Sequence, residues 1–125
     1  MKYLYAEQVV RMHAVLLERY GGEEGGGHRG AEDEGAEAAV QAVRNSYYET
    51  VEELAVAYAV YIVQGHVFMD GNKRTGHGAM CLFLEANGRN LSLPDAVKVM
   101  VELQARAERG ERTDSLIQWI VEQLV

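Results

Sequence analysis

The sequence of 125 residues is poor in residues that stiffen or cross-link a chain, because it has one proline and one cysteine. A single cysteine, Cys81, excludes an internal disulfide and is typical of a reducing compartment. No uninterrupted apolar run approaches the ~20 residues of a membrane-spanning helix, and the N-terminus lacks the apolar core of a signal peptide. The expected location is therefore the cytoplasm, with no attachment to a membrane.

Positive charge is also scarce, with 12 Lys and Arg against 19 Asp and Glu and a formal net charge of -7. An acidic protein gains little from a phosphate backbone, so no direct binding of nucleic acid is expected. Any phosphate site must be built locally from a few well-placed groups. The length and an apolar content of 48% fit a single domain, residues 1–125, around one hydrophobic core.

Because proline is scarce and Ala, Leu, Glu, Gln and Val dominate long stretches, the chain is predicted to be all-α. Residues 21–35 hold seven glycines and five acidic residues and are predicted to form an exposed connection. The expected architecture is a compact bundle of about six helices. These helices are expected at residues 5–20, 31–44, 51–65, 72–87 and 94–109, with a last one starting at Thr113 or Asp114.

Residues 51–65 are apolar on nearly every face, which predicts a central buried helix. The polar stretch HVFMDGNKRTG, from His66 to Gly76, separates this helix from a second apolar helix at 72–87. The sequence therefore places a dense set of hydrogen-bonding and charged groups on a loop between two buried helices.

The start of that second helix is a candidate anion site, because its first backbone N–H groups and its dipole face an incoming ligand. Gly71 allows close approach to the backbone, and Asn72 adds a side-chain donor. Lys73 supplies a mobile charge, and Arg74 supplies a rigid fork suited to phosphate oxygens. Together these residues could hold a polyphosphate.

Three further residues of the stretch complete this chemistry. Asp70 is a hard carboxylate that can bind Mg²⁺ together with substrate phosphates. His66 is the one group there that exchanges a proton near neutral pH, so it is a candidate general base. Phe68 is expected to anchor the loop in the core. These parts suit phosphoryl or nucleotidyl transfer, although spacing alone indicates only an anion site with a candidate base.

The nine residues HVFMDGNKR resemble the Fic/Doc signature H-x-F-x-[D/E]-[G/A]-N-[G/K]-R at every defined position. The segment NKRTG, followed by a helix ending in FLEANG, resembles the death-on-curing (Doc) branch of that family. The resemblance implies an all-helical fold with the motif loop between two central helices. It also implies roles for the motif residues: His66 as general base, Phe68 as anchor, Asp70 as Mg²⁺ ligand, Gly71 and Asn72 as anion hole, and Arg74 as phosphate ligand.

Lys73 decides which branch the resemblance favours. Fic enzymes, most of which transfer AMP, carry glycine there, whereas Doc proteins carry lysine and present the γ-phosphate of ATP. The resemblance therefore implies a toxin that uses Mg²⁺ and ATP to phosphorylate a threonine of elongation factor Tu and so stops translation. The inhibitory pattern [S/T]-x-x-x-E-[G/N] is absent from the sequence. Inhibition by an antitoxin in trans is therefore expected.

Three alternatives stay open: an AMP transferase, a catalytically silent module that binds the antitoxin, and a metal-dependent hydrolase built on His66 and Asp70. Three positions depart from the commonest Doc pattern, namely Val67, Gly76 and Gly78. His77 is interpreted as structural or as part of the site wall. The segment NSYYET, residues 45–50, is interpreted either as a flap that aligns the target or as cover for the core.

Overall fold

The computed structural model describes residues 1–21 and 29–125, with side chains described from residue 33 onward in the second range. The described residues form helices and connections without any strand, so the all-α prediction is confirmed. The helices are α1 (Ala6–Tyr20), α2 (Arg29–Arg44), α3 (Val51–Gln64), α4 (Asn72–Ala86), α5 (Ala96–Glu108) and α6 (Thr113–Val121).

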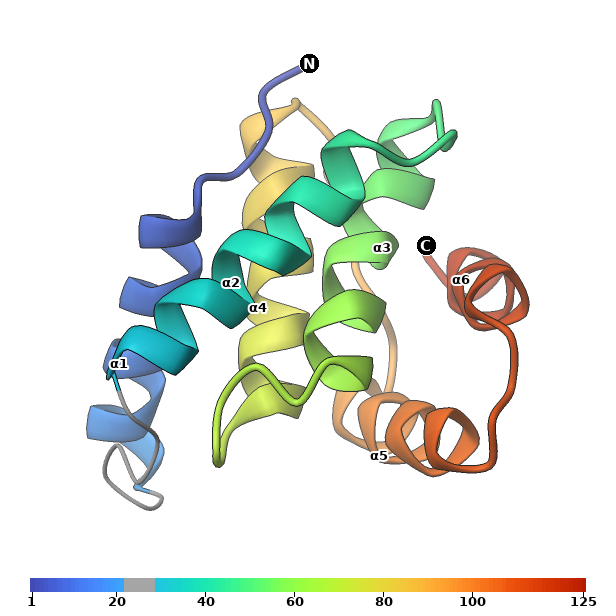
Figure 1. The fold of residues 1–125 in the computed structure, drawn as a ribbon. Coiled ribbons are helices and arrows are strands. Elements are labelled where there is room, and N and C mark those ends of the chain that lie inside the picture. The colour runs from blue at the N-terminus through green and yellow to red at the C-terminus, as the bar shows by residue number, and fades with distance from the viewer. Residues whose placement is uncertain (22–28) are drawn as a thin grey trace.

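Helix α3 is the centre of the bundle and packs against α2, α4, α5 and α6 (Figure 1). Helix α1 packs on α2 and α4 at one side, while α5 and α6 close the other side. Buried apolar side chains from all six helices form one core cluster. None of the described helices combines the length and the apolar character needed to cross a membrane.

The two central helices, α3 and α4, begin and pack as the sequence pattern predicts. At the start of α3, the side chain of Thr50 accepts a hydrogen bond from the Glu53 amide, and Glu53 accepts one from the Thr50 amide, which forms a capping box. Gly76 lets α4 approach α3 closely, because a Cβ there would lie 3.2 Å from the carbonyl oxygen of Ala59. The loop that joins these two helices is therefore held between tightly packed elements.

The helix boundaries differ from the prediction by more than one residue at two places. Helix α5 starts at Ala96 instead of residue 94, because Asp95 has a φ of 54° and cannot be part of a right-handed helix. Helix α2 starts at Arg29, so the predicted connection at 21–35 is shorter, and residues 22–28 of it lie outside the described range. The predicted stop after α4 is confirmed, because Gly88 has a φ of 74°.

The segment 45–50 joins α2 to α3 at the end of α3 opposite to the polar loop (Figure 1). The hydroxyl of Tyr47 donates to Oδ2 of Asp114 at 2.5 Å, and the hydroxyl of Tyr48 donates to Oδ1 of the same carboxylate. Tyr48 also packs against the core. Both tyrosines are thus tied to α6, but only Tyr48 fits the interpretation as cover for the core, because Tyr47 is 73% exposed.

Candidate active site

The polar loop begins with a strained residue at the end of α3. His66 has a φ of 44°, in the left-handed region that glycine adopts at low cost and other residues rarely enter. The helix ends in the usual way, with the Gly65 amide donating to the carbonyl of Tyr61 at 2.9 Å. A histidine at a position that favours glycine suggests that the imidazole itself is needed there.

After His66 the loop turns into the core. Phe68 is 2% exposed and its ring stacks on the imidazole of His13, with 3.8 Å between centroids and an interplanar angle of 6°. Nε2 of His13 donates to the carbonyl oxygen of Asp70 at 2.8 Å. Val67 packs beside Gly35 of α2, since a Cβ added at Gly35 would lie 3.3 Å from Cγ1 of Val67. Helices α1 and α2 thus fix the path of the loop.

Asn72 closes the loop on itself. Its Oδ1 accepts from the amide of Phe68 at 3.0 Å, and its Nδ2 donates to the carbonyl of Phe68 at 2.6 Å. Oδ1 of Asp70 accepts from the amide of Gly71 at 2.7 Å. The amide side chain that we expected to face an anion therefore holds the loop, and Asn72 can offer a ligand its backbone N–H.

The start of α4 has the geometry of an anion site. Gly71 has a φ of 83°, and a Cβ there would lie 3.4 Å from Cδ2 of His13. The first amide of the helix that reaches a backbone carbonyl is that of Thr75, which donates to Gly71 at 2.9 Å. The preceding amides of the first turn have no helical acceptor, and Gly71 has no side chain with which to cap them.

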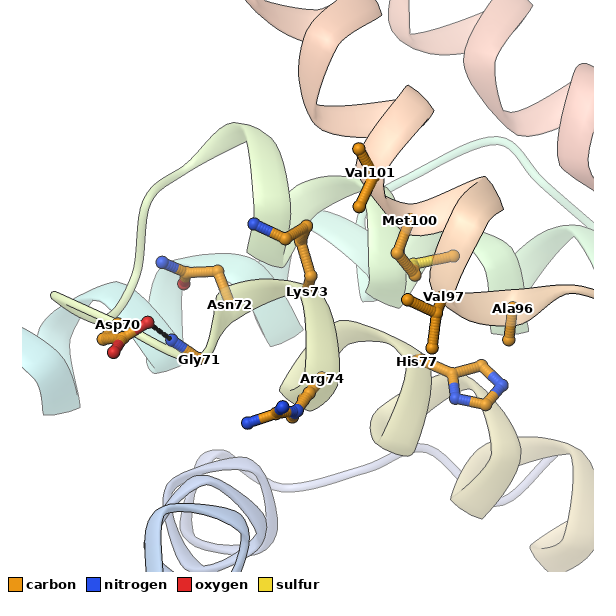
Figure 2. A pocket seen from close by; sticks show the side chains of 10 residues that line it. All are labelled: Asp70, Gly71, Asn72, Lys73, Arg74, His77, Ala96, Val97, Met100 and Val101. Carbon is orange, nitrogen blue, oxygen red and sulfur yellow. Dashed lines mark hydrogen bonds between the residues drawn. The ribbon is translucent and has the colours of Figure 1, made fainter. Parts of the chain in front are cut away.

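These amides border a hollow of about 310 Å³ between α4 and α5, which we call the α4–α5 pocket (Figure 2). One side of it is polar and includes the predicted metal and phosphate ligands. The facing side, from α5, is apolar. The lining residues are Asp70, Gly71, Asn72, Lys73, Arg74, His77, Ala96, Val97, Met100 and Val101.

The two cations of the first turn extend in different directions (Figure 2). Nζ of Lys73 donates to Oε1 of Gln104 on α5 at 2.8 Å. The guanidinium of Arg74 lies over the ring of Tyr20, at the end of α1, with Cζ 4.8 Å from the centroid. Lys73 is half-buried and Arg74 is exposed, so the lysine is the more constrained of the two.

His66 borders a separate hollow of about 190 Å³, which we call the His66 recess. The recess is lined by Val63, Gln64, His66, Gln104, Ala107 and Glu108. The structure thus brings Asp70 to Arg74 together in one pocket and places His66 in the other. Gln104 connects the two hollows, because it lines the recess and accepts from Lys73 of the pocket.

Residues 3–84, which include the whole polar loop, match the Fic/DOC family. The chain belongs to this family. It is also 36% identical, over 92 residues, to the protein named Protein kinase doc from Escherichia phage P1, and the match covers 70% of each protein. Helix α5, which supplies the apolar side of the pocket, lies beyond the segment that defines the Fic/DOC match.

His77 of the Fic/DOC chain lies in the wall of the α4–α5 pocket, which fits the second of its two predicted roles. Burial lowers the pKa of His77, which favours the neutral imidazole. Its Nε2 lies 3.4 Å from Sγ of Cys81, one turn later. Burial, followed by the charge of Glu85, raises the pKa of the Cys81 thiol, so this cysteine is not an activated nucleophile.

Asp70 is the residue of this Fic/DOC site that could hold Mg²⁺. Magnesium takes one or two carboxylates when it also binds substrate phosphates. Asp70 is exposed on the pocket wall, and one of its oxygens is oriented by the Gly71 amide. Among the described residues no group of three or more His, Cys, Asp or Glu is placed to hold a metal. A single carboxylate at this place suits a metal that is shared with substrate phosphates.

Two residues that contact the motif from other helices, His13 and Gln104, were not predicted from the sequence. For His13 a signal existed, because it lies four residues from Val9 and from Leu17, which places it on one face of the first helix with these apolar residues. A histidine on such a stripe indicates a buried polar contact. For Gln104 no signal existed, because a glutamine in an amphipathic helix is ordinary.

Proposed function

We propose that residues 1–125 form a single Fic/Doc domain that acts as a Doc-type toxin. The reaction is Mg²⁺- and ATP-dependent phosphorylation of a threonine of elongation factor Tu, which arrests translation in the cytoplasm. The substrate is a protein, with no direct role for nucleic acid or a membrane. A cognate antitoxin inhibits the toxin in trans, because the sequence has no inhibitory helix motif of its own.

One observation carries the choice of kinase over AMP transferase. Lys73 stands at the branch-deciding position of the motif, and its ammonium group lies on the wall of the α4–α5 pocket. A cation at that point occupies space and supplies charge where glycine would leave room. The relative that carries the name Protein kinase doc supports the same choice.

The pocket suits a nucleotide in size and in the distribution of its polar groups. Its volume of about 310 Å³ is at the lower end of ligand pockets. The amides that follow Gly71 and the side chains of Lys73 and Arg74 bind and orient the phosphates. Asp70 would hold Mg²⁺, which neutralises phosphate charge when it is bound. The apolar side from α5 faces the less polar part of the nucleotide.

His66 acts as the general base from the recess. Its exposed side chain can be reached by a hydroxyl on a protein segment that enters there. The imidazole accepts the hydroxyl proton while the hydroxyl oxygen forms a bond to the γ-phosphorus. The bond between that phosphorus and the oxygen bridging to the β-phosphate breaks, and ADP leaves. The positive φ of His66 sets the direction of its Cα–Cβ bond.

The test is transfer from labelled ATP to purified elongation factor Tu in the presence of Mg²⁺. Label from γ-labelled ATP is expected on the target, with a mass increase of roughly 80, the mass of a phosphoryl group. Label from α-labelled ATP and an increase of roughly 329 would instead select AMP transfer. His66→Ala should abolish either reaction, and Lys73→Gly should sharply reduce the kinase reaction alone.

A catalytically silent module remains the contrasting outcome. In that case the double variant His66→Ala, Asp70→Ala would arrest growth as the natural protein does, and no label would reach elongation factor Tu. Growth arrest that disappears in this variant, with the antitoxin complex still formed, supports an enzyme. Complex formation on a sizing column is the control for correct folding.

A further inference from the structure

Gln104 of α5 holds the branch-deciding lysine at the boundary between the two hollows. Its Oε1 accepts from Nζ of Lys73 at 2.8 Å, across 31 positions of sequence. Both side chains are half-buried. The same glutamine lines the recess in which His66 lies. The contact between Lys73 and Gln104 is therefore part of the wall between the pocket for phosphates and the recess for the hydroxyl.

The orientation of the glutamine is itself fixed by a third residue. Nε2 of Gln104 donates to Oε1 of Glu108, one turn later on α5, at 3.1 Å. Because the carboxylate can only accept, the amide nitrogen faces Glu108 and the amide oxygen faces the ammonium group. The negative charge also polarises the amide, which makes its oxygen a better acceptor. Glu108, Gln104 and Lys73 thus form a directed chain.

We propose that Gln104 is the positioning and specificity-determining residue for Lys73. This inference rests on the proposed kinase function and names what selects the transferred group within it. The ammonium group of a lysine is carried on a flexible four-carbon side chain, so without a hydrogen-bond partner it would sample many places along the pocket. Tethered to Gln104, it stays next to the recess, where the phosphate nearest His66 must lie. The tether therefore favours γ-phosphoryl transfer over AMP transfer.

The contact is a property of this chain and not of the motif. Gln104 lies outside residues 3–84, which define the family match. The motif supplies Lys73, and Gln104 of α5 fixes the position of its ammonium group. Phosphoryl transfer depends on placing the reacting groups within about an ångström. Loss of the contact between Lys73 and Gln104 should therefore lower the rate of transfer more than it weakens ATP binding.

Gln104→Leu removes the acceptor at nearly constant volume. We expect the acetylation rate of Lys73 by an amine-reactive ester, measured by peptide mass spectrometry without ATP, to rise at least threefold. We expect kcat for γ-phosphoryl transfer to fall about tenfold with KM for ATP changed less than twofold. The share of label transferred from α-labelled ATP should rise. Gln104→Glu restores an acceptor for Lys73 but loses the donor to Glu108, so it should return both readouts only in part.

Gln41→Leu is the matched control. Gln41 makes the same kind of bond, to Glu37 one turn away at 3.0 Å, on α2 and at an exposed position. This variant should change neither the reactivity of Lys73 nor the kinetics. An unchanged Lys73 acetylation rate in folded Gln104→Leu would overturn the proposal, whatever the activity. If the natural protein phosphorylates nothing, the acetylation rate still reports on the tether, so the two failures are distinct.

Discussion

The imidazole of His13 lies flat on the ring of Phe68 and donates a hydrogen bond to the carbonyl of Asp70. One side chain of α1 thereby holds both the anchor of the motif loop and the backbone of its predicted metal ligand. His13 is 6% exposed, so water cannot replace either contact without opening the structure. The loop is therefore held from outside the motif by His13 as well as from within it by Asn72.

His13→Ala should therefore lower the free energy of unfolding by about 1–3 kcal/mol, because it leaves the Asp70 carbonyl without its donor and a gap against Phe68. His13→Phe keeps the ring stack, loses only the hydrogen bond and should cost less. Urea denaturation measures both, and ATP affinity should fall further in His13→Ala. Equal stability of the natural protein and His13→Ala would contradict the role given to this contact.

The positive φ of His66 predicts a conflict between stability and activity. His66→Gly and His66→Ala both remove the imidazole, so both should be inactive. Only glycine relieves the left-handed strain, and it should leave the protein about 0.5–1 kcal/mol more stable than the alanine variant. Thermal unfolding of the two variants side by side measures this. An alanine variant as stable as the glycine variant would mean that the strain is absent.

Gly76 and Gly78 of α4 offer a matched pair. A Cβ at Gly76 would meet the backbone of Ala59 at 3.2 and 3.3 Å, and a buried helix backbone cannot move aside easily. Gly76→Ala should therefore destabilise the protein by about 1–3 kcal/mol. A Cβ at Gly78 would lie 2.6 Å from Sδ of Met12, a flexible side chain that can turn away.

Gly78→Ala should in consequence raise the stability by up to about 1 kcal/mol, through the higher helix propensity of alanine. Thermal unfolding is again the measurement. If both alanine variants shift the midpoint in the same direction by the same amount, the close packing at Gly76 has no energetic role.

His77 predicts a dependence of stability on pH. Burial lowers its pKa in the folded protein, while the unfolded chain keeps a pKa of about 6.5. The unfolded state therefore binds more protons between these two values, and stability falls as pH drops below about 6.5 toward the folded pKa. Above that range the effect is constant. The loss saturates once the pH is below both values.

Replacing this group by His77→Gln should flatten that part of the profile. The measurement is the urea midpoint at several pH values from 5 to 8, taken as the difference between the natural protein and the variant. Other histidines cancel in this difference. Parallel profiles for the two proteins would show that His77 is equally basic in the folded and unfolded chains.

Much of the fold could be predicted from the sequence because helix signals are local. The apolar run of α3, the capping box at Thr50 and the stop at Gly88 depend on neighbours in sequence. The start of α5 could not be predicted in the same way. Pro94 suited the first turn, but the left-handed backbone of Asp95 delays the helix.

The candidate site also contains residues that could be predicted from local sequence and residues that could not. Residues 66–74 are contiguous, so the chemistry of this motif could be predicted from the sequence alone. His13 contacts the loop across 57 positions of sequence, and Gln104 contacts Lys73 across 31. Such pairs depend on how helices pack, which a single sequence does not encode locally. The hydrogen bonds between the Asn72 side chain and the backbone of Phe68 could not be predicted from the residue types either.

Within the described part of the chain, α1 packs on α2 and α4 and not on the central helix. A partial unfolding that releases α1 would remove His13 from the motif loop and Tyr20 from Arg74, yet it would leave the pairing of α3 with α4 in place. Heating should therefore inactivate the protein at a temperature at which only the helical content of α1 has been lost. Backbone amides of the loop should exchange with deuterium together with those of α1.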